Sequence, residues 1–415
     1  MEYFNVADQA RMQSHLEQAK AYKQMLKSIK LIGHRGMGVT SNINSEISTN
    51  SLIPENTISS FKEAIILGAD GIELDVFSAK DGTVMVIHSD ELRLHVYNDS
   101  NILTIAQSGS LLPCGETEQS FIVGNKNYEE LKQLIVGSKQ ETIPTLLEVL
   151  NLIQEANVIR TIHGAEPLIL NIEFKNSKII KSAIMLAIKG TLSTIQQHIK
   201  NYPENLLSFN HIYFCSFNHQ ALKYLINTAN TLLIRDKLQF AVNVDAASLF
   251  GEHNIDSDYK PIVTPIKYLD EELLNLKKLF TAEAEFIAYD VVVWNIYRPF
   301  IELVKARNKE LHISAPNYRM ETISQEFCIF LLKVSDKISQ ILFKSDAVNR
   351  SREALHDKAN KLQKYKMRRS LLENKQKSST ITETLEVQSN SSSDLNSQTL
   401  NSQTVLGSCL NKPDI

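Results

Sequence analysis

From residue 31 onward, short apolar runs alternate with stretches in which apolar residues recur at helical spacing, and this alternation restricts the fold more than any other feature. Strands separated by helices favour a parallel sheet with the helices outside it. The predicted strands lie at 31–34, 70–77, 83–88, 167–174, 211–217, 237–242, 310–314 and 338–343. The predicted helices lie at 56–67, 144–156, 180–200, 218–229, 298–309 and 321–334, with Asn56 and Asn218 as plausible N-caps.

About eight strands predict an α/β chain folded as a (β/α)₈ TIM barrel, with a doubly wound sheet as the alternative. Residues 90–140 do not fit one element, and we interpret them as an insertion between the third strand and the next helix. The barrel is predicted to span residues 31–350. Residues 1–30 are predicted to form a helical lead-in packed against it, because Tyr22 and nearby apolar residues recur at helical spacing.

The character of the chain changes after about residue 350. Residues 351–377 predict a basic helix whose segment 358–369 carries six lysines and arginines. This helix is predicted to expose a solvated face, although contact with acidic lipid or RNA stays open. Residues 378–415 are rich in Ser, Thr, Asn and Gln and are predicted to be a disordered polar tail, serving as a linker, a partner-binding segment or an export signal.

Composition excludes several classes of protein. A net charge of −3 provides no general field for nucleic acid or anionic membranes, so no nucleic-acid partner is expected. The four cysteines are far apart, without metal-ligand or redox spacing, which is typical of a reducing compartment. The charged N-terminus lacks a signal peptide's apolar core, and no 18-residue apolar run occurs. We therefore predict a cytoplasmic protein, with export by a route that needs no signal peptide left open.

Three acidic residues lie near the ends of predicted strands. Glu73 and Asp75 are two positions apart in "GIELDV", so both carboxylates project from one face of a strand. Glu173, in "LNIEFK", would be a third carboxylate on the same interior. Like charges so close need a cation or a proton. Oxygen ligands without cysteine favour a hard ion, so one Mg²⁺ or Ca²⁺ is predicted.

Cations and imidazoles accompany these acids. Arg35 follows His34 at the end of the first predicted strand, Lys175 follows Glu173, and His88 ends the third strand. A metal ion beside Arg35 and Lys175 is suited to holding a phosphoryl group and its developing charge. His34 and His88 can then act as general acid and general base.

At this point the residues resemble a known family, the glycerophosphodiester phosphodiesterases. The matching segments are "GHRG" (33–36), "PENTISSF" (54–61), "GADGIELDVFSAKDGTVMVIH" (68–88), "IPTLLEVL" (143–150), "LNIEFK" (170–175) and "CSFNHQAL" (215–222). They occur in the family's order. The resemblance is strong over roughly residues 31–222 and fades towards about residue 350.

The resemblance implies a (β/α)₈ barrel that uses one divalent cation to hydrolyse glycerophosphodiesters to glycerol 3-phosphate and an alcohol. It implies the same metal ligands, acid–base pair and phosphate contacts that the residues suggest. Glu55 and Asn56 belong to the matching "PENT". Glu55 is expected either to orient Arg35 or, together with Asn56, to cap the following helix.

Two rival functions remain at this stage. One keeps the site but acts on a lysophospholipid or phosphoinositide at a membrane surface, with residues 358–369 as a peripheral anchor. The other is a catalytically inactive barrel that binds a phosphorylated ligand or a protein partner. The intact set of acids, cations and histidines favours the phosphodiesterase with a small-molecule glycerophosphodiester substrate.

Overall fold

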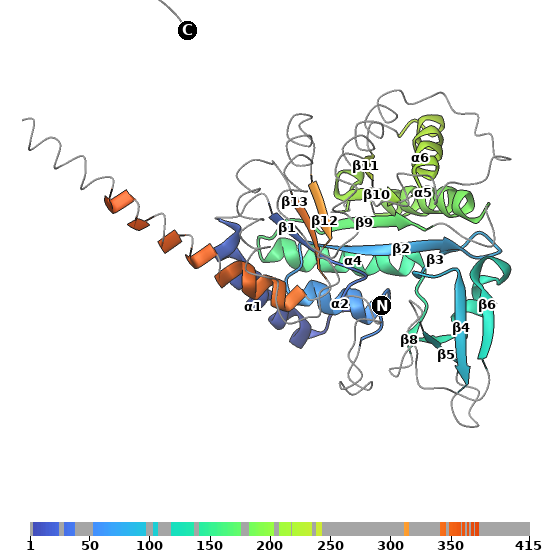
Figure 1. Ribbon diagram of the computed structural model, residues 1–415, viewed down its shortest axis with the longest axis horizontal. Helices are drawn as coiled ribbons and strands as arrows, with labels where there is room; N and C mark the ends of the chain where they lie inside the picture. The colour runs from blue at the N-terminus through green and yellow to red at the C-terminus, as the bar shows by residue number, and fades with distance from the viewer. Residues whose placement is uncertain are drawn as a thin grey trace, which may run out of the picture. The chain divides into compact units, whose positions relative to one another are not determined.

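The computed structural model describes residues 3–24, 29–37, 53–96, 103–106, 118–136, 141–175, 182–202, 207–216, 218–234, 238–242, 311–314, 341–345, and 348–372 apart from residues 358, 362, 365, 366 and 369. The chain divides into two compact units, residues 1–359 and 360–415. Figure 1 shows the elements of the first unit, in which helices accompany a long parallel sheet.

Seven strands of the described chain form one parallel row in the order β11-β10-β9-β2-β1-β13-β12. Their bounds are β1 Ile29–Gly33, β2 Gly71–Ser78, β9 Ile169–Phe174, β10 Ile212–Ser216, β11 Gln239–Val242, β12 Leu311–Ser314 and β13 Ile341–Ser345. The strands follow chain order along the row, and the last strand, β13, pairs with the first, β1. This wrapping of the last strand onto the first is the order of a barrel, so the predicted fold class is confirmed.

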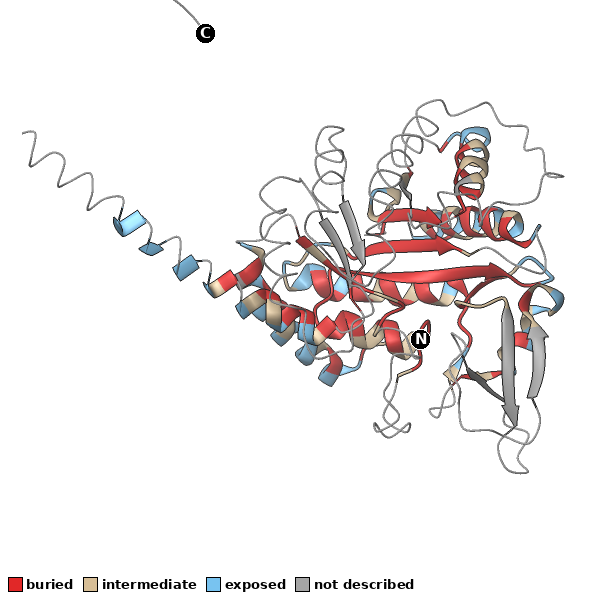
Figure 2. Ribbon diagram, viewed as in Figure 1, coloured by how far each residue is buried: buried red, intermediate tan, exposed pale blue. Residues whose placement is uncertain are grey.

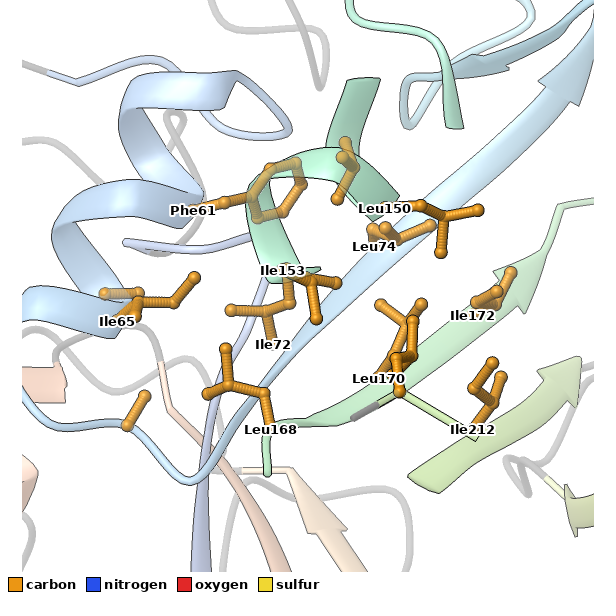
Figure 3. Close-up of a cluster of buried hydrophobic side chains, with 14 of the residues drawn as sticks. Phe61, Ile65, Ile72, Leu74, Leu150, Ile153, Leu168, Leu170, Ile172 and Ile212 are labelled. Atoms are coloured by element: carbon orange, nitrogen blue, oxygen red, sulfur yellow. The ribbon is translucent and has the colours of Figure 1, made fainter. Parts of the chain in front are cut away.

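The two faces of the sheet have different neighbours. Alternate residues such as Ile72, Leu170 and Ile212 join the large apolar core together with Phe61 and Ile153 of the helices, as Figure 3 shows. The intervening residues form a separate small apolar cluster of Ile32, Ile169 and Tyr213, and they also include the buried acids of β2 and β9. A doubly wound sheet carries helices on both faces. A face lined by carboxylates is instead that of a barrel interior, so the doubly wound alternative is not adopted.

Five helices contribute side chains to the large apolar core: α1 Val6–Lys23, α2 Ile58–Ile66, α4 Leu146–Ile162, α5 Ala183–Asn201 and α6 His219–Thr231. Their starts follow local chemistry. Thr145 caps α4 in a capping box with Glu148, and Asn218 caps α6 as predicted. Asn56 does not cap α2: Thr57 does, accepting the backbone N–H of Ser60. Figure 2 shows how the strands β2, β9 and β10 are buried along their length.

The third predicted strand differs from its neighbours. β3, Val84–Val86, is shorter than residues 83–88 and pairs antiparallel with β2, because the tight turn at 79–82 folds it straight back. Residues 90–140 then hold a short helix, α3 Tyr128–Lys132, and four strands of a second, five-stranded sheet ordered β6-β4-β5-β7-β8. These strands are β4 Glu91–Val96, β5 Leu103–Ala106, β6 Glu118–Ile122, β7 Ile135–Val136 and β8 Glu141–Thr142, so β8 lies just beyond residue 140. The predicted insertion is therefore a small sheet of its own.

Specific contacts hold the N-terminal segment to the rest of the first unit. The carboxylate of Glu155 in α4 accepts the backbone N–H groups of Tyr3 and Phe4 at 2.9 and 2.7 Å. Asp8 and Lys62 pair at 2.7 Å between α1 and α2. These contacts agree with the expected packing of the lead-in. None of the helices among the described residues is long and apolar enough to cross a membrane.

Towards the C-terminus, residues 348–357 are helical, and so are the remaining described residues up to 372. Lys361, Lys364 and Arg368 are exposed, as a solvated face requires. The predicted helices 298–309 and 321–334 and the predicted tail 378–415 lie outside the described residues. The proposed domain boundaries stay predictions.

Candidate active site

The turn after β1 explains the glycines around His34 and Arg35. Arg35 and Gly36 both have positive φ, 49° and 87°, which brings the chain back over α2. There the hydroxyl of Ser60 donates to the Arg35 carbonyl at 2.9 Å and accepts the Met37 N–H at 2.8 Å. Positive φ at a non-glycine residue stores strain that surrounding contacts must hold. The turn thus fixes the backbone of both polar residues.

Replacing Gly36 with alanine is expected to destabilise the protein more than replacing Gly82. Both glycines have φ of 87°, so each alanine bears the left-handed cost of about 1–2 kcal/mol. A Cβ at Gly36 would also lie 2.6 Å from the backbone carbon of Ser60, whereas nothing lies within 4 Å at Gly82. Overpacking adds about 1–3 kcal/mol, to be measured by chemical denaturation of both variants. Equal losses in the two variants would contradict the crowding at Gly36.

Three carboxylates meet on the inner face of the sheet. Glu73 and Asp75 project from β2, and Glu173 projects from β9, whose position lies directly beside Asp75 in the parallel register. One oxygen from each lies within 4.8 Å of the others, and all three side chains are buried. The predicted convergence of these acids is therefore observed.

Two cations contact this carboxylate cluster of Glu73, Asp75 and Glu173. The Nε of Arg35 lies 3.2 Å from an Asp75 oxygen, and the Arg35 backbone N–H donates to Glu73 at 3.0 Å. The Nζ of Lys175 lies 3.2 Å from the other Asp75 oxygen and also contacts Glu173. Both predicted cations are thus brought to the acids.

The protonation states follow from these neighbours. Burial alone would raise the pKa of Asp75, but Lys175 and Arg35 outweigh it and hold that pKa well below the usual range. Burial would lower the pKa values of Lys175 and Arg35, but the adjacent carboxylates, above all Asp75, raise both. Asp75 is therefore ionised, and Arg35 and Lys175 are charged, at neutral pH.

The two histidines border the same cluster. The Nε2 of His34 lies 3.9 Å from a Glu73 oxygen, and the His34 side chain is 20% exposed. His88 follows β3, and its Nδ1 is buried without a hydrogen-bond partner among the described residues. Burial, opposed by Asp75 and reinforced by Lys175, lowers the pKa of His88 to about 4. Its imidazole is therefore uncharged at neutral pH.

Glu55 and Asn56 form an outer ring around this cluster. Glu55 is fully buried, and it accepts a hydrogen bond from Nη1 of Arg35 at 3.0 Å. Asn56, with φ of 54°, donates its side-chain amide to Asp75 at 2.9 Å and accepts the Asp75 backbone N–H at 3.3 Å. These contacts agree with the alternative in which Glu55 orients Arg35. The alternative in which Glu55 and Asn56 cap the following helix is wrong, because Thr57 caps α2.

A divalent cation fits the residues present. Two oxygens that bind one ion at about 2.4 Å can be at most about 4.8 Å apart, and the oxygens of the three carboxylates lie within 4.8 Å of one another. The four acids Glu55, Glu73, Asp75 and Glu173 outnumber Arg35 and Lys175 by two charges. A divalent cation would bring that sum to zero, as buried charge requires.

One contributor was not predicted from sequence. Ser60 holds both sides of the turn through its hydroxyl, as described above. It lies in the "PENTISSF" segment, where a serine on the first turn of a helix ordinarily indicates no more than helix-start chemistry. The role of Ser60 depends on the close approach of Gly36 to the first turn of α2, and the spacing of residues in the sequence does not reveal that approach.

The fold and the site together define an α/β-barrel protein with an acid-lined, cation-rimmed centre at the carboxyl ends of its strands. Residues 34–313 match the model of the glycerophosphoryl diester phosphodiesterase family. The chain belongs to this family.

Individual relatives support the same conclusion. A glycerophosphodiester phosphodiesterase of Caldanaerobacter subterraneus subsp. tengcongensis is 32% identical over 177 residues, 41% of this chain and 56% of the relative. A glycerophosphodiester phosphodiesterase of Bacillus altitudinis is 30% identical over 171 residues, 41% of this chain and 55% of the relative. The chain therefore matches little more than half the length of each.

Among solved structures, an Oleispira antarctica phosphodiesterase in complex with sn-glycerol-3-phosphate is similar, with 20% identity and a TM-score of 0.42. The similarity covers 79% of this chain and 96% of that chain.

Proposed function

We propose that this chain is a metal-dependent phosphodiesterase that hydrolyses glycerophosphodiesters to glycerol 3-phosphate and an alcohol. The observation that carries the proposal is the meeting of Glu73, Asp75 and Glu173 with Arg35 and Lys175 on one buried face. Family membership and the relatives' printed activity support the substrate class.

Each residue has a proposed task. Glu73, Asp75 and Glu173 hold one Mg²⁺ or Ca²⁺, which when bound polarises a phosphoryl oxygen. Arg35 and Lys175 contact the phosphate and offset the negative charge that develops on it.

Proton transfer falls to the imidazoles. One of His34 and His88 accepts the proton of the attacking oxygen, and the other gives a proton to the departing alcohol. The uncharged imidazole of His88 can accept a proton directly, whereas to act as the donor it must first take one up. Glu55 and Asn56 act indirectly. Glu55 orients the Arg35 guanidinium, and Asn56 orients the Asp75 carboxylate.

The substrate class is tested by turnover of the full chain on glycerophosphocholine and glycerophosphoethanolamine beside lysophosphatidylcholine, each with Mg²⁺ or Ca²⁺. We expect the deacylated diesters to be cleaved at least tenfold faster in kcat/KM, with glycerol 3-phosphate released. Faster cleavage of the lysolipid would favour the membrane-surface alternative, with residues 358–369 as anchor. Absence of turnover on every substrate would favour the inactive binding protein.

A further inference from the structure

Asn171 is a polar residue on the same inner face of the sheet as the carboxylate cluster. It precedes Glu173 by two positions in β9, so the two side chains project to the same side. The parallel register places Asn171 directly beside Glu73 of β2. Its side chain is fully buried. Asn171 therefore lies among the proposed ligands of the divalent ion, although it carries no charge itself.

The side-chain amide of Asn171 is fixed on one side and unused on the other. Its Oδ1 accepts a hydrogen bond from the thiol of Cys215 at 2.9 Å. Its Nδ2 is buried and has no hydrogen-bond partner among the described residues. A buried donor without an acceptor destabilises a protein, and such groups are rare in native interiors. The Nδ2 group therefore indicates a task for Asn171 other than support of the fold.

The contact with Cys215 shows which way the Asn171 amide leans. In the register between β9 and β10, Tyr213 is the direct neighbour of Asn171, and Cys215 is the direct neighbour of Glu173. Cys215 is thus two residues nearer the carboxyl ends of the strands than Tyr213. Because Oδ1 of Asn171 reaches the Cys215 thiol, the amide leans towards the level of Glu173 in the carboxylate cluster.

Glu73 is the carboxylate that the sheet places nearest to this amide. Neighbouring strands are about 4.8 Å apart, whereas two residues along one strand span about 6.6 Å, so Glu73 lies closer to Asn171 than Glu173 does. One Glu73 oxygen accepts the Arg35 backbone N–H at 3.0 Å. An ionised carboxylate offers about four acceptor positions on its two oxygens, so Glu73 can bind an ion and accept a further donor at the same time.

Asn56 provides the same kind of donor to another ligand of the cluster. Its side-chain amide donates to Asp75 at 2.9 Å. Carboxylates that bind metal ions are usually oriented by such hydrogen bonds, and the loss of one typically weakens metal binding by about 10–100-fold. Asn171 offers Glu73 an amide donor from the adjacent position in the sheet.

We propose that Asn171 is a positioning residue that orients Glu73 as a ligand of the ion, an inference that rests on the proposed metal-dependent function. Nδ2 of Asn171 donates to the Glu73 carboxylate when the ion is bound. The thiol of Cys215 holds Oδ1 on the opposite arm of the amide, so that a donor and not a carbonyl oxygen faces Glu73.

The test is calorimetric titration of the full chain with Mg²⁺ and with Ca²⁺, together with thermal unfolding in EDTA. Asn171→Leu keeps the branched shape of the side chain and removes Nδ2, so the affinity for the ion should fall by about 10–100-fold. Its Tm in EDTA should stay close to that of the parent. The variant loses a hydrogen bond from a weak thiol donor, but it also loses the buried Nδ2 that has no acceptor.

Asn157 of α4 provides a matched control. It is also fully buried, and its Nδ2 also has no partner among the described residues, but its Oδ1 accepts the backbone N–H of Leu168 at 2.8 Å. Asn157→Leu should lower Tm in EDTA, because the buried Leu168 N–H loses its acceptor, and should leave the ion affinity unchanged.

Two substitutions of Cys215 test how the amide is held. Cys215→Ala removes the donor to Oδ1 and should weaken ion binding several-fold. Cys215→Ser keeps a donor at this position and should bind the ion more tightly than Cys215→Ala does. Equal affinities of these two variants would contradict the role of the thiol.

The outcomes separate this inference from the proposed function. Parental ion affinity in Asn171→Leu, with weakened binding in Glu173→Gln, would overturn the role of Asn171 and leave the metal-dependent function standing. Equal losses of affinity in Asn171→Leu and Asn157→Leu would also overturn that role. Absence of ion binding by the parent would overturn both proposals.

A crystal structure of the parent chain with Ca²⁺ makes the test independent of whether the variants fold. Nδ2 of Asn171 should lie within about 3.2 Å of a Glu73 carboxylate oxygen. Pairing of Nδ2 with any other group, such as the neighbouring Tyr213, would contradict the proposal.

Discussion

Replacing His88 with alanine is expected to lower kcat for glycerophosphocholine by about 10²–10⁴-fold, the usual contribution of a positioned proton-transfer group. The loss should come without a matching loss of stability, because Nδ1 of His88 forms no hydrogen bond with the described part of the chain that the substitution would break. His34→Ala should lower kcat within the same range. Steady-state kinetics and thermal unfolding of both variants provide the measurement.

A matched control separates catalysis from folding in this experiment. His163 lies at the C-terminal cap of α4, away from the carboxylate cluster, so His163→Ala should keep the parent's kcat. Parental turnover in both His34→Ala and His88→Ala would show that the imidazoles do not transfer the protons. If His88→Ala lowered Tm as much as the loss of a buried, hydrogen-bonded side chain does, the result would contradict the unpaired Nδ1 of His88 described above.

Chelation with EDTA is expected to abolish activity, with Mg²⁺ or Ca²⁺ restoring it. The physical reason is that the four acids of the site outnumber its two cations by two charges, so without the ion the carboxylates repel the phosphate. Binding the ion should also raise Tm, since a ligand at 100 times its Kd stabilises by about 2.7 kcal/mol. Calorimetric titration should give one ion per chain.

Substitution of one ligand identifies the ion's position. Glu173→Gln should weaken ion binding in the titration, whereas Glu148→Gln, which removes the partner of Lys132 at the start of α4, should leave it unchanged. Full activity in EDTA together with a Tm that is indifferent to divalent ions would remove the metal from the mechanism. An equal effect of the two glutamines would show that the carboxylate cluster is not the binding site.

The parts of the fold that sequence predicts are those set by local pattern. Alternation of residues in "GIELDV" and "LNIEFK" places Glu73, Asp75 and Glu173 on one face, because side-chain direction in a strand has a period of two. The parallel register then sets Asp75 beside Glu173. Convergence of the acids therefore follows from pattern together with fold class.

The parts that sequence misses depend on contacts between distant segments. Nothing local shows that Asn56 turns from the helix towards Asp75, leaving Thr57 as the cap, because that choice is made by the positive φ of Asn56 and by a partner on β2. The antiparallel return of β3 has a local cause instead, the turn at 79–82. Its apolar residues match those of the parallel strands, and only the short turn before it sets its direction.

The pairing of β13 with β1 has a consequence for how the chain is made. The His34 backbone N–H donates to the carbonyl of Ser345 at 3.0 Å, so one flank of the first strand is completed by a segment more than three hundred positions downstream. During translation this edge of β1 stays unpaired until residue 345 has left the ribosome. The histidine turn is thus among the earliest parts of the barrel to be synthesised and among the last to be enclosed.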